Sequence, residues 1–216
     1  MKKEGLSIVN EYKPLIFDKE AETWEKIKSD ILQLAKDNFR MEDEKEQVLG
    51  VIIPENEREN FANITPEGDI ISYNSLEEAF LNPETVITLL EDPETDKIIG
   101  YSWAMPMKKM DPRSDKAETA YIYQCVIEKD YRGNKLIEKI NTPLLQELYQ
   151  QGYKYVEKDA RNFLPEGETR KKTYAQSVLD EFAKTFVEEP YAHNPFGLGR
   201  QIHFNIDIEA YLTKSK

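Results

Sequence analysis

The sequence predicts an α/β (α+β) protein built around a mixed, mostly antiparallel sheet. Two extended runs, 85–90 and 97–105, lie on either side of a turn at Pro93 and form a predicted hairpin. A third run, 118–127, leads into a helical pattern, and a fourth run starts at Tyr153. Two strands joined by a helix are parallel neighbours or nearly so, which makes the sheet mixed.

The last part of the chain supports the same class. From 201 to 210, apolar residues alternate with polar ones, as in a strand with one face in the core and the other in water. An amphipathic helix is predicted over 168–187. Another helix is predicted from Gly133 to near Gly152, and Pro143 should kink it.

The N-terminal half has weaker patterns. Residues 1–17 are expected to be a loosely attached lead-in, and an amphipathic helix is predicted over 19–39. A second short helix, 42–49, precedes a long loop, 51–74, which prolines and polar residues interrupt. A capping box beginning at Ser75 then starts a further short helix.

Length and composition limit the class of protein. The 216 residues can form one well-cored domain, and 39% hydrophobic with 32% charged residues fits a soluble globular chain. No apolar run reaches the roughly 18 residues of a membrane span and no signal peptide is recognised, so we expect a cytoplasmic protein without membrane attachment. One cysteine excludes an internal disulfide, and one cysteine with two histidines disfavours a metal site.

The net charge of −12 bears on the choice of partner. Because phosphate backbones attract Lys and Arg, we expect no nucleic-acid partner. An acidic surface favours a cationic partner or substrate, such as an amine. Solubility explains the acidic surface equally well.

The stretch 118–148 carries the main functional signal. A strand rich in β-branched and aromatic residues passes through a tight turn, Arg132, Gly133 and Asn134, into a helix with apolar residues at spacing four. The first backbone N–H groups of such a helix lack partners, and together with the helix dipole they form an anion site. Gly133 removes the side chain that would block a phosphate. An ordinary strand–turn–helix connection is the alternative.

The end of this strand and the turn after it resemble the acetyl-CoA signature of the GNAT N-acetyltransferases. In that family, a strand with a hydrophobic end leads through a short loop to Gln/Arg-x-x-Gly-x-Gly/Ala at the start of a helix. Arg132 matches the first position, and Gly133 with Asn134 matches the common Arg-Gly-Asn variant. Lys135 stands at the position of the key glycine and Ile137 at that of Gly or Ala, so the loop is degenerate.

The order of elements over 19–212 is similar to that of the same family. The resemblance implies a single GNAT-like acyltransferase domain over 1–216, with helices on both faces of the sheet. It also implies a splayed central parallel pair, which admits the pantetheine arm of acetyl-CoA. Acetyl-CoA would be a cosubstrate, and no metal would be needed. The chain departs from the family pattern after Tyr174, because no Gly-Phe follows it.

The resemblance also assigns the residues that bind the cosubstrate. The backbones of Cys125 and Ile127, at the end of the splayed strand, would pair with the pantetheine amides in the manner of an added strand. The pyrophosphate would be held by backbone amides of the turn and of the first helical residues, namely Arg132, Gly133, Asn134, Lys135, Leu136 and Ile137.

The expected reaction is direct attack of an amine on the thioester, which needs a neutral amine and a proton for the departing thiolate. Tyr174 is the candidate acid, and a core tyrosine on an apolar stripe is the alternative reading. Tyr123, predicted to share a strand face with Cys125, and Glu118, at the entry of the same strand, are candidate bases. Packing and surface roles are the alternatives for both. His203 is expected to be solvated on the polar face of the last strand.

Three functions remain open from the sequence. The first is an acetyl-CoA-dependent N-acetyltransferase that acts on an amine of a small molecule or a protein. The second is a catalytically inactive GNAT-like module that binds CoA or has a regulatory role, and the third is an unrelated α/β protein. The acceptor pocket would be built from the loops 51–74, 107–117 and 190–200. The exposed edge of the final strand could pair in a homodimer.

Overall fold

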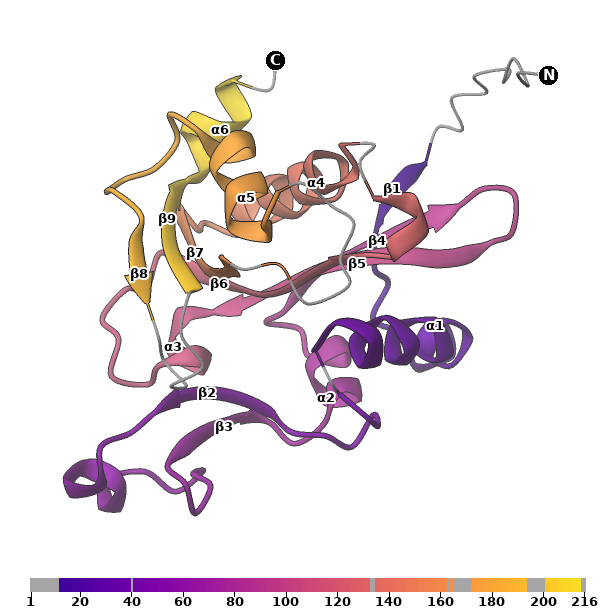
Figure 1. The fold of residues 1–216 in the computed structure, drawn as a ribbon. Helices are drawn as coiled ribbons and strands as arrows, with labels where there is room; N and C mark the ends of the chain where they lie inside the picture. Colours follow the sequence, from indigo (N-terminus) through magenta and orange to yellow (C-terminus); the bar gives the residue numbers. More distant parts are fainter. Residues whose placement is uncertain are drawn as a thin grey trace.

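The computed structural model describes residues 12–39, 41–132, 135–162, 164, 172–193 and 201–214. The strands of its main sheet are β1 (Lys13–Ile16), β4 (Val86–Asp92), β5 (Lys97–Pro106), β6 (Thr119–Ile127), β7 (Tyr155–Arg161), β8 (Tyr191–His193) and β9 (Gln201–Asp207). They follow the order β1-β4-β5-β6-β7-β9-β8 (Figure 1). Only β6 and β7 are parallel neighbours among these described strands, so the predicted mixed, mostly antiparallel sheet is confirmed.

Helices cover both faces of this sheet, as predicted (Figure 1). One face carries α4 (Leu136–Gln150), α5 (Tyr174–Phe182) and α6 (Ile208–Lys214), and the other carries α1 (Ala21–Phe39) and α2 (Leu76–Leu81). Each face has its own apolar core. Trp24 of α1 and Trp103 of β5 are buried in one core, and Leu144 of α4 and Phe204 of β9 are buried in the other. Shorter helical turns are α3 (Met107–Met110) and two 3-10 helices, Glu55–Asn60 and Lys129–Tyr131.

Residues 12–17, expected to belong to a loose lead-in, are part of the fold. The four residues of β1 pair antiparallel with β4. The Phe17 N–H donates to the Ile87 carbonyl at 3.0 Å, and the buried Phe17 ring packs against Phe80. This expectation was wrong because an edge strand of four residues that includes Pro14 is too short to show a period of two.

The predicted helix over 42–49 is wrong. This segment turns and then forms β2 (Val48–Ile52), which pairs with β3 (Asp69–Tyr73) in a separate two-stranded sheet. The charged residues of the segment favour a helix, but packing overrides this local preference. Gly50 approaches α3 so closely that a Cβ atom there would lie 2.3 Å from the Met110 carbonyl oxygen.

The final strand is shorter than predicted. β9 ends at Asp207, whose carboxylate accepts the Ala210 N–H at 2.8 Å, and α6 begins at the next residue. Ile208 and Tyr211 are both buried, so the apolar period changes here from that of a strand to that of a helix. β8 and the segment before it cover the outer edge of β9. The strand edge expected to pair in a homodimer is therefore occupied within the chain.

The helix predicted over 168–187 corresponds to the shorter α5, and residues 165–171 lie outside the described part of the chain. Among the described residues, every helix is too short or too polar to traverse a lipid bilayer.

Candidate functional site

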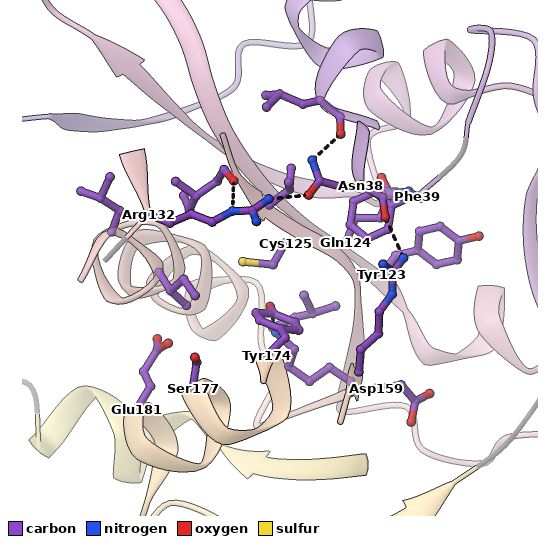
Figure 2. A pocket seen from close by; sticks show the side chains of 18 of the residues that line it. Asn38, Phe39, Tyr123, Gln124, Cys125, Arg132, Asp159, Tyr174, Ser177 and Glu181 are labelled. Carbon is purple, nitrogen blue, oxygen red and sulfur yellow. Dashed lines mark hydrogen bonds between the residues drawn. The ribbon is translucent and has the colours of Figure 1, made fainter. Parts of the chain in front are cut away.

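The strands β6 and β7 diverge after a short common stretch. Their parallel pairing covers three residue pairs, from Thr119 opposite Tyr155 to Tyr121 opposite Glu157. Beyond Tyr121, β6 continues along β5 to Ile127, while β7 continues along β9. A pocket of about 1540 Å³ lies at this divergence, and residues of both strands and of α1, α4 and α5 line it (Figure 2). The predicted splayed parallel pair is therefore present.

A bulge in β6 sets the direction of the side chains that face the pocket. The pairing with β5 changes register between Trp103 and Ala104, so that Tyr123 is an extra residue on β6. As a result, Tyr123 packs against Trp103 in the core under α1, while Cys125 packs toward α4. The prediction that Tyr123 and Cys125 share a face is wrong, because the bulge interrupts the alternation of the strand.

Cys125 and Ile127 lie on β6 beyond the divergence and form a wall of the pocket. The partly exposed Cys125 sulfur lies 3.8 Å from Oδ1 of Asn141 on α4. The Ile127 carbonyl accepts a hydrogen bond from Nε of Arg132 at 2.9 Å. Among the described residues, no strand pairs with this part of β6 on its β7 side, so its backbone can pair with an extended ligand.

The structure describes only part of the turn between β6 and α4. Gly133 and Asn134, both predicted to bind pyrophosphate, lie outside the described residues. Lys135 precedes the first helical residue and has a left-handed backbone, with φ 55° and ψ 25°. This conformation favours glycine, the residue that the predicted signature has at this position. The Lys135 side chain makes no capping hydrogen bond, which leaves amides of the first helical turn available to a ligand.

The first turn of α4 borders the pocket with Leu136, Ile137 and Glu138. Leu136 is buried in the core and Ile137 packs partly against the same residues. Charged side chains of both signs line this end of the pocket, namely Lys129, Arg132 and Lys135 with Glu128, Asp130 and Glu138. Because these charges balance, the preference of this end for an anion comes from the N-terminus of α4.

Asn38, near the end of α1, connects the ends of the two diverging strands. Its Oδ1 accepts a hydrogen bond from Nη2 of Arg132 at 2.8 Å, and its carbonyl accepts one from Nη2 of Arg161 at 2.7 Å (Figure 2). Arg132 follows β6 and Arg161 ends β7. The end of α1 therefore forms a wall of the pocket and holds both strand ends.

Tyr174, the predicted acid, begins α5 and lines the pocket (Figure 2). Nζ of Lys158, on β7, donates a hydrogen bond to its hydroxyl oxygen at 2.7 Å and lies 4.9 Å from the ring centre. Burial raises the pKa of Tyr174, and the neighbouring Cys125 adds to the increase. Burial lowers the pKa of Lys158.

Glu181 is a second titratable group of α5 in the same pocket (Figure 2). Its Oε1 accepts hydrogen bonds from Nδ2 of Asn141 and from the Tyr211 hydroxyl, both at 3.3 Å. Burial raises the pKa of Glu181 to about 7, although Lys158 opposes the shift. A carboxyl that titrates near neutrality can accept a proton under working conditions.

The two predicted bases are placed less favourably. The Tyr123 hydroxyl accepts a hydrogen bond from the Leu49 N–H at 3.3 Å, and burial raises the pKa of Tyr123 to about 12. A phenol of this kind stays protonated at neutral pH, and it holds β2 against β6. Glu118 precedes β6, at the opposite end of the strand from Ile127, and pairs with Lys154 at 2.6 Å on the exposed surface. The structure does not bring Glu118 into the pocket.

His203 is buried, whereas we expected it to be solvated. Its Nδ1 lies 3.1 Å from Oδ1 of Asp159, and its Nε2 lies 3.3 Å from Oε2 of Glu157. Burial opposes the charged imidazolium, but hydrogen bonds to the two carboxylates and their charges outweigh it and raise the pKa of His203 to about 9. The Tyr121 hydroxyl also donates to Asp159, at 2.7 Å. Within the described part of the chain, no set of three or more His, Cys, Asp or Glu side chains could hold a metal ion.

Comparison with known proteins identifies the fold of this chain. No family model matches the chain, and no curated protein matches it significantly. Among solved structures, the aminoglycoside 6'-acetyltransferase type Ii gives a TM-score of 0.54 at 14% identity, over 90% of this chain and 96% of that one. Two CoA-dependent acyl-homoserine lactone synthases, BjaI and MesI, give TM-scores of 0.56 and 0.55 at 14% identity, over 94% of this chain and 87% and 93% of theirs.

The chain has the GNAT fold. Three residues that line the pocket were not predicted from the sequence, namely Asn38, Lys158 and Glu181. Lys158 carries a recognisable signal, because it stands between Val156 and Ala160 at an inward position of a buried strand. The other two lie on helices, where one polar residue near an apolar stripe is common.

Proposed function

We propose that this chain is a CoA-dependent N-acyltransferase that transfers an acetyl group to an amine by direct attack. The observation that carries the proposal is the pocket at the divergence of β6 and β7, which has on one wall the β6 backbone, with no described strand paired to it on its β7 side, and a helix N-terminus at its end. Both features suit an extended molecule with a diphosphate, such as acetyl-CoA.

The pantetheine arm would lie along β6, where the backbone of Cys125 and the N–H of Ile127 would pair with its amides. Amides of Leu136 and Ile137, in the first turn of α4, would bind the pyrophosphate, assisted by Arg132 and Lys135. Tyr174, across the pocket, would protonate the departing thiolate. Glu181, whose carboxyl has a pKa of about 7, would suit uptake of a proton from the acceptor.

The acceptor would be a cationic amine. The net charge of −12 favours such a molecule in the approach to the pocket. Structurally similar proteins include an aminoglycoside acetyltransferase and BjaI, which has been solved with SAM and isopentyl-CoA. A panel of acceptors would therefore include aminoglycosides, SAM and a lysine-containing peptide, each with acetyl-CoA and with a branched acyl-CoA.

A GNAT-like module that binds CoA without catalysis is the second candidate. Lys135 and Ile137 replace the glycines of the signature and favour this reading, because their side chains narrow the approach to the backbone. Binding of acetyl-CoA with no CoA release across the whole panel would support the module. Turnover that Tyr174→Phe abolishes would support the enzyme.

Thermal unfolding with and without acetyl-CoA tests both candidates against an unrelated function. A ligand at 100 times its Kd adds about 2.7 kcal/mol of stability, which raises Tm by several degrees. We expect Cys125→Trp, which fills the pocket beside β6, to lose this increase. Gln151→Trp, which introduces the same side chain at an exposed turn after α4, should retain it. No increase for the unchanged protein at millimolar acetyl-CoA would contradict both candidates.

A further inference from the structure

Lys158 is a buried charged residue of the pocket that the proposed reaction does not use. Its exposed fraction is 1%, and it lies on β7 beyond the point where β7 leaves β6. Among the described residues, no carboxylate lies within ion-pair distance of its Nζ. An ammonium buried without an ionic partner lowers stability. Packing alone therefore does not account for a lysine at this position.

The partner of Lys158 is the hydroxyl of Tyr174. Its Nζ lies 2.7 Å from the phenolic oxygen. An ammonium can only donate, so the oxygen accepts this hydrogen bond and the proton of Tyr174 points in another direction. Cys125 lies on β6, on the opposite side of the divergence, and its proximity contributes to the raised pKa of Tyr174 (Figure 2). The phenolic proton can therefore point across the pocket toward β6.

We propose that Lys158 is a positioning residue for Tyr174, whose hydroxyl it orients so that the phenolic proton faces the sulfur of a bound thioester. The inference rests on the proposed function, in which the thioester lies between β6 and β7. The alternative is a structural lysine whose hydrogen bond to Tyr174 only satisfies its own buried donor.

The reaction balances with this assignment. The amine nitrogen forms a bond to the carbonyl carbon of the thioester, and the carbon–sulfur bond breaks with its electron pair on sulfur. The sulfur takes the proton of Tyr174, and the ammonium of Lys158 stabilises the phenolate that forms. Glu181 takes up the proton that the amine nitrogen loses, and an equivalent proton returns to the phenolate through solvent, so that the products are an amide and free CoA thiol.

Kinetics of four proteins test the assignment: the unchanged protein, Lys158→Met, Tyr174→Phe and the double variant. Met is similar to Lys in length but cannot donate a hydrogen bond. With acetyl-CoA and an amine from the acceptor panel, we expect Lys158→Met to lower kcat by about 10-fold or more, because it removes the support of a general acid. The KM for acetyl-CoA should stay within about twofold, because Lys158 does not bind the cosubstrate.

The double variant gives the decisive comparison. If Lys158 acts through Tyr174, Lys158→Met should cause no further loss in the Tyr174→Phe background. An equal loss in both backgrounds, or an unchanged kcat in Lys158→Met, would overturn the proposal. Lys154→Met is the control, because Lys154 is exposed and pairs with Glu118 outside the pocket. Lys158→Leu, which likewise cannot donate a hydrogen bond, takes the place of Lys158→Met if the latter does not fold.

An NMR titration that needs no acceptor amine tests the role of Lys158 separately from the proposed function. In protein with ¹³C at the tyrosine Cζ, the Tyr174 signal is identified by its loss in Tyr174→Phe. In the unchanged protein, we expect the chemical shift of this signal to change with pH as Lys158 titrates. In Lys158→Met, this change with pH should be lost. Glu181, Asp159 and Cys125 also act electrostatically on Lys158, and a Glu181→Gln variant identifies the carboxyl step.

Each outcome of this titration has a definite meaning. The same pH dependence with and without Lys158 overturns the proposal. A lost step in Lys158→Met combined with no binding of acetyl-CoA upholds the hydrogen bond and rejects the proposed function, so the two failures can be told apart.

Discussion

Lys135 has the backbone of a glycine at the start of α4, with φ 55°. For an L-residue, this conformation costs roughly 1 to 2 kcal/mol relative to the right-handed region, because Cβ approaches the carbonyl oxygen. The strain lies at the position where the GNAT signature has its key glycine. The sequence therefore has a lysine where the backbone conformation favours a glycine.

Replacement of this residue tests the strain. We expect Lys135→Gly to raise the free energy of unfolding by up to about 1 kcal/mol, because glycine adopts a positive φ without strain. Lys139→Gly is the matched control: it makes the same change at an exposed position inside α4 and should lower stability by about 1 kcal/mol. Urea unfolding of both variants measures the two effects. A loss of stability in both would show that Lys135 makes favourable contacts that outweigh its strain.

His203 makes stability depend on pH. Its folded pKa of about 9 lies above the ordinary 6.5, so its contribution is complete below pH 6.5 and is lost as pH rises through 9. We expect a loss of about 1 to 2 kcal/mol over this range after solvent screening is allowed for.

His203→Gln should remove this loss, and denaturant unfolding at a series of pH values measures it. Glu181 and Lys19, with pKa values of about 7 and about 8, also titrate in this range. Because both proteins contain them, their contributions cancel in the difference between the two free energies of unfolding at each pH. Parallel stability curves would contradict the assignment to His203.

At the scale of elements, long segments with a clear period and the capped helix α2 could be predicted, and short strands could not. The hairpin of β4 and β5, the strand β6 and the helices α1 and α4 each have enough residues to show a period. The strands β1, β2 and β8 have five residues or fewer, and they form because neighbouring strands supply their hydrogen bonds.

The same limit applies to the candidate site. The sequence indicated the position of Tyr174 and the turn before α4 through the resemblance to a family. It could not indicate the bulge at Tyr123, because a bulge changes the pairing register and leaves composition unchanged. The faces of residues beyond Tyr123 were therefore assigned wrongly. The partners of Lys158 and His203 come from other elements of the fold and follow no local sequence pattern.

The attachment of β1 can be tested at two adjacent residues. Phe17 is 4% exposed and packs against Phe80, whereas Ile16 is 46% exposed. We expect Phe17→Ala to lower the free energy of unfolding by about 3 kcal/mol, because it leaves a cavity in the core. Ile16→Ala should change it by less than about 1 kcal/mol. Chemical denaturation measures both, and a neutral Phe17→Ala would support a loosely attached lead-in.

At the scale of the whole molecule, Asn38 links parts that are distant in sequence. Removal of its side chain breaks the hydrogen bond to the guanidinium of Arg132. We expect Asn38→Ala to lower stability by about 1 to 2 kcal/mol and to weaken acetyl-CoA binding, because a charged donor loses its acceptor beside the pocket. Gln33→Ala, on the exposed side of the same helix, removes only a bond to Asp37 and should change stability by less than about 0.5 kcal/mol. Thermal unfolding and titration calorimetry measure the two quantities, and equal effects of the two variants would contradict a linking role for Asn38.

The short parallel contact of β6 with β7 divides the main sheet into two blocks. One block holds β1, β4, β5 and β6, the other holds β7, β9 and β8, and three residue pairs join them within the sheet. A donor molecule seated between the blocks would supply the inter-strand hydrogen bonds that end at Tyr121. The amide hydrogens of Cys125 and Ile127 would then exchange with solvent more slowly, and the two blocks would open as one cooperative unit with the donor and as two units without it.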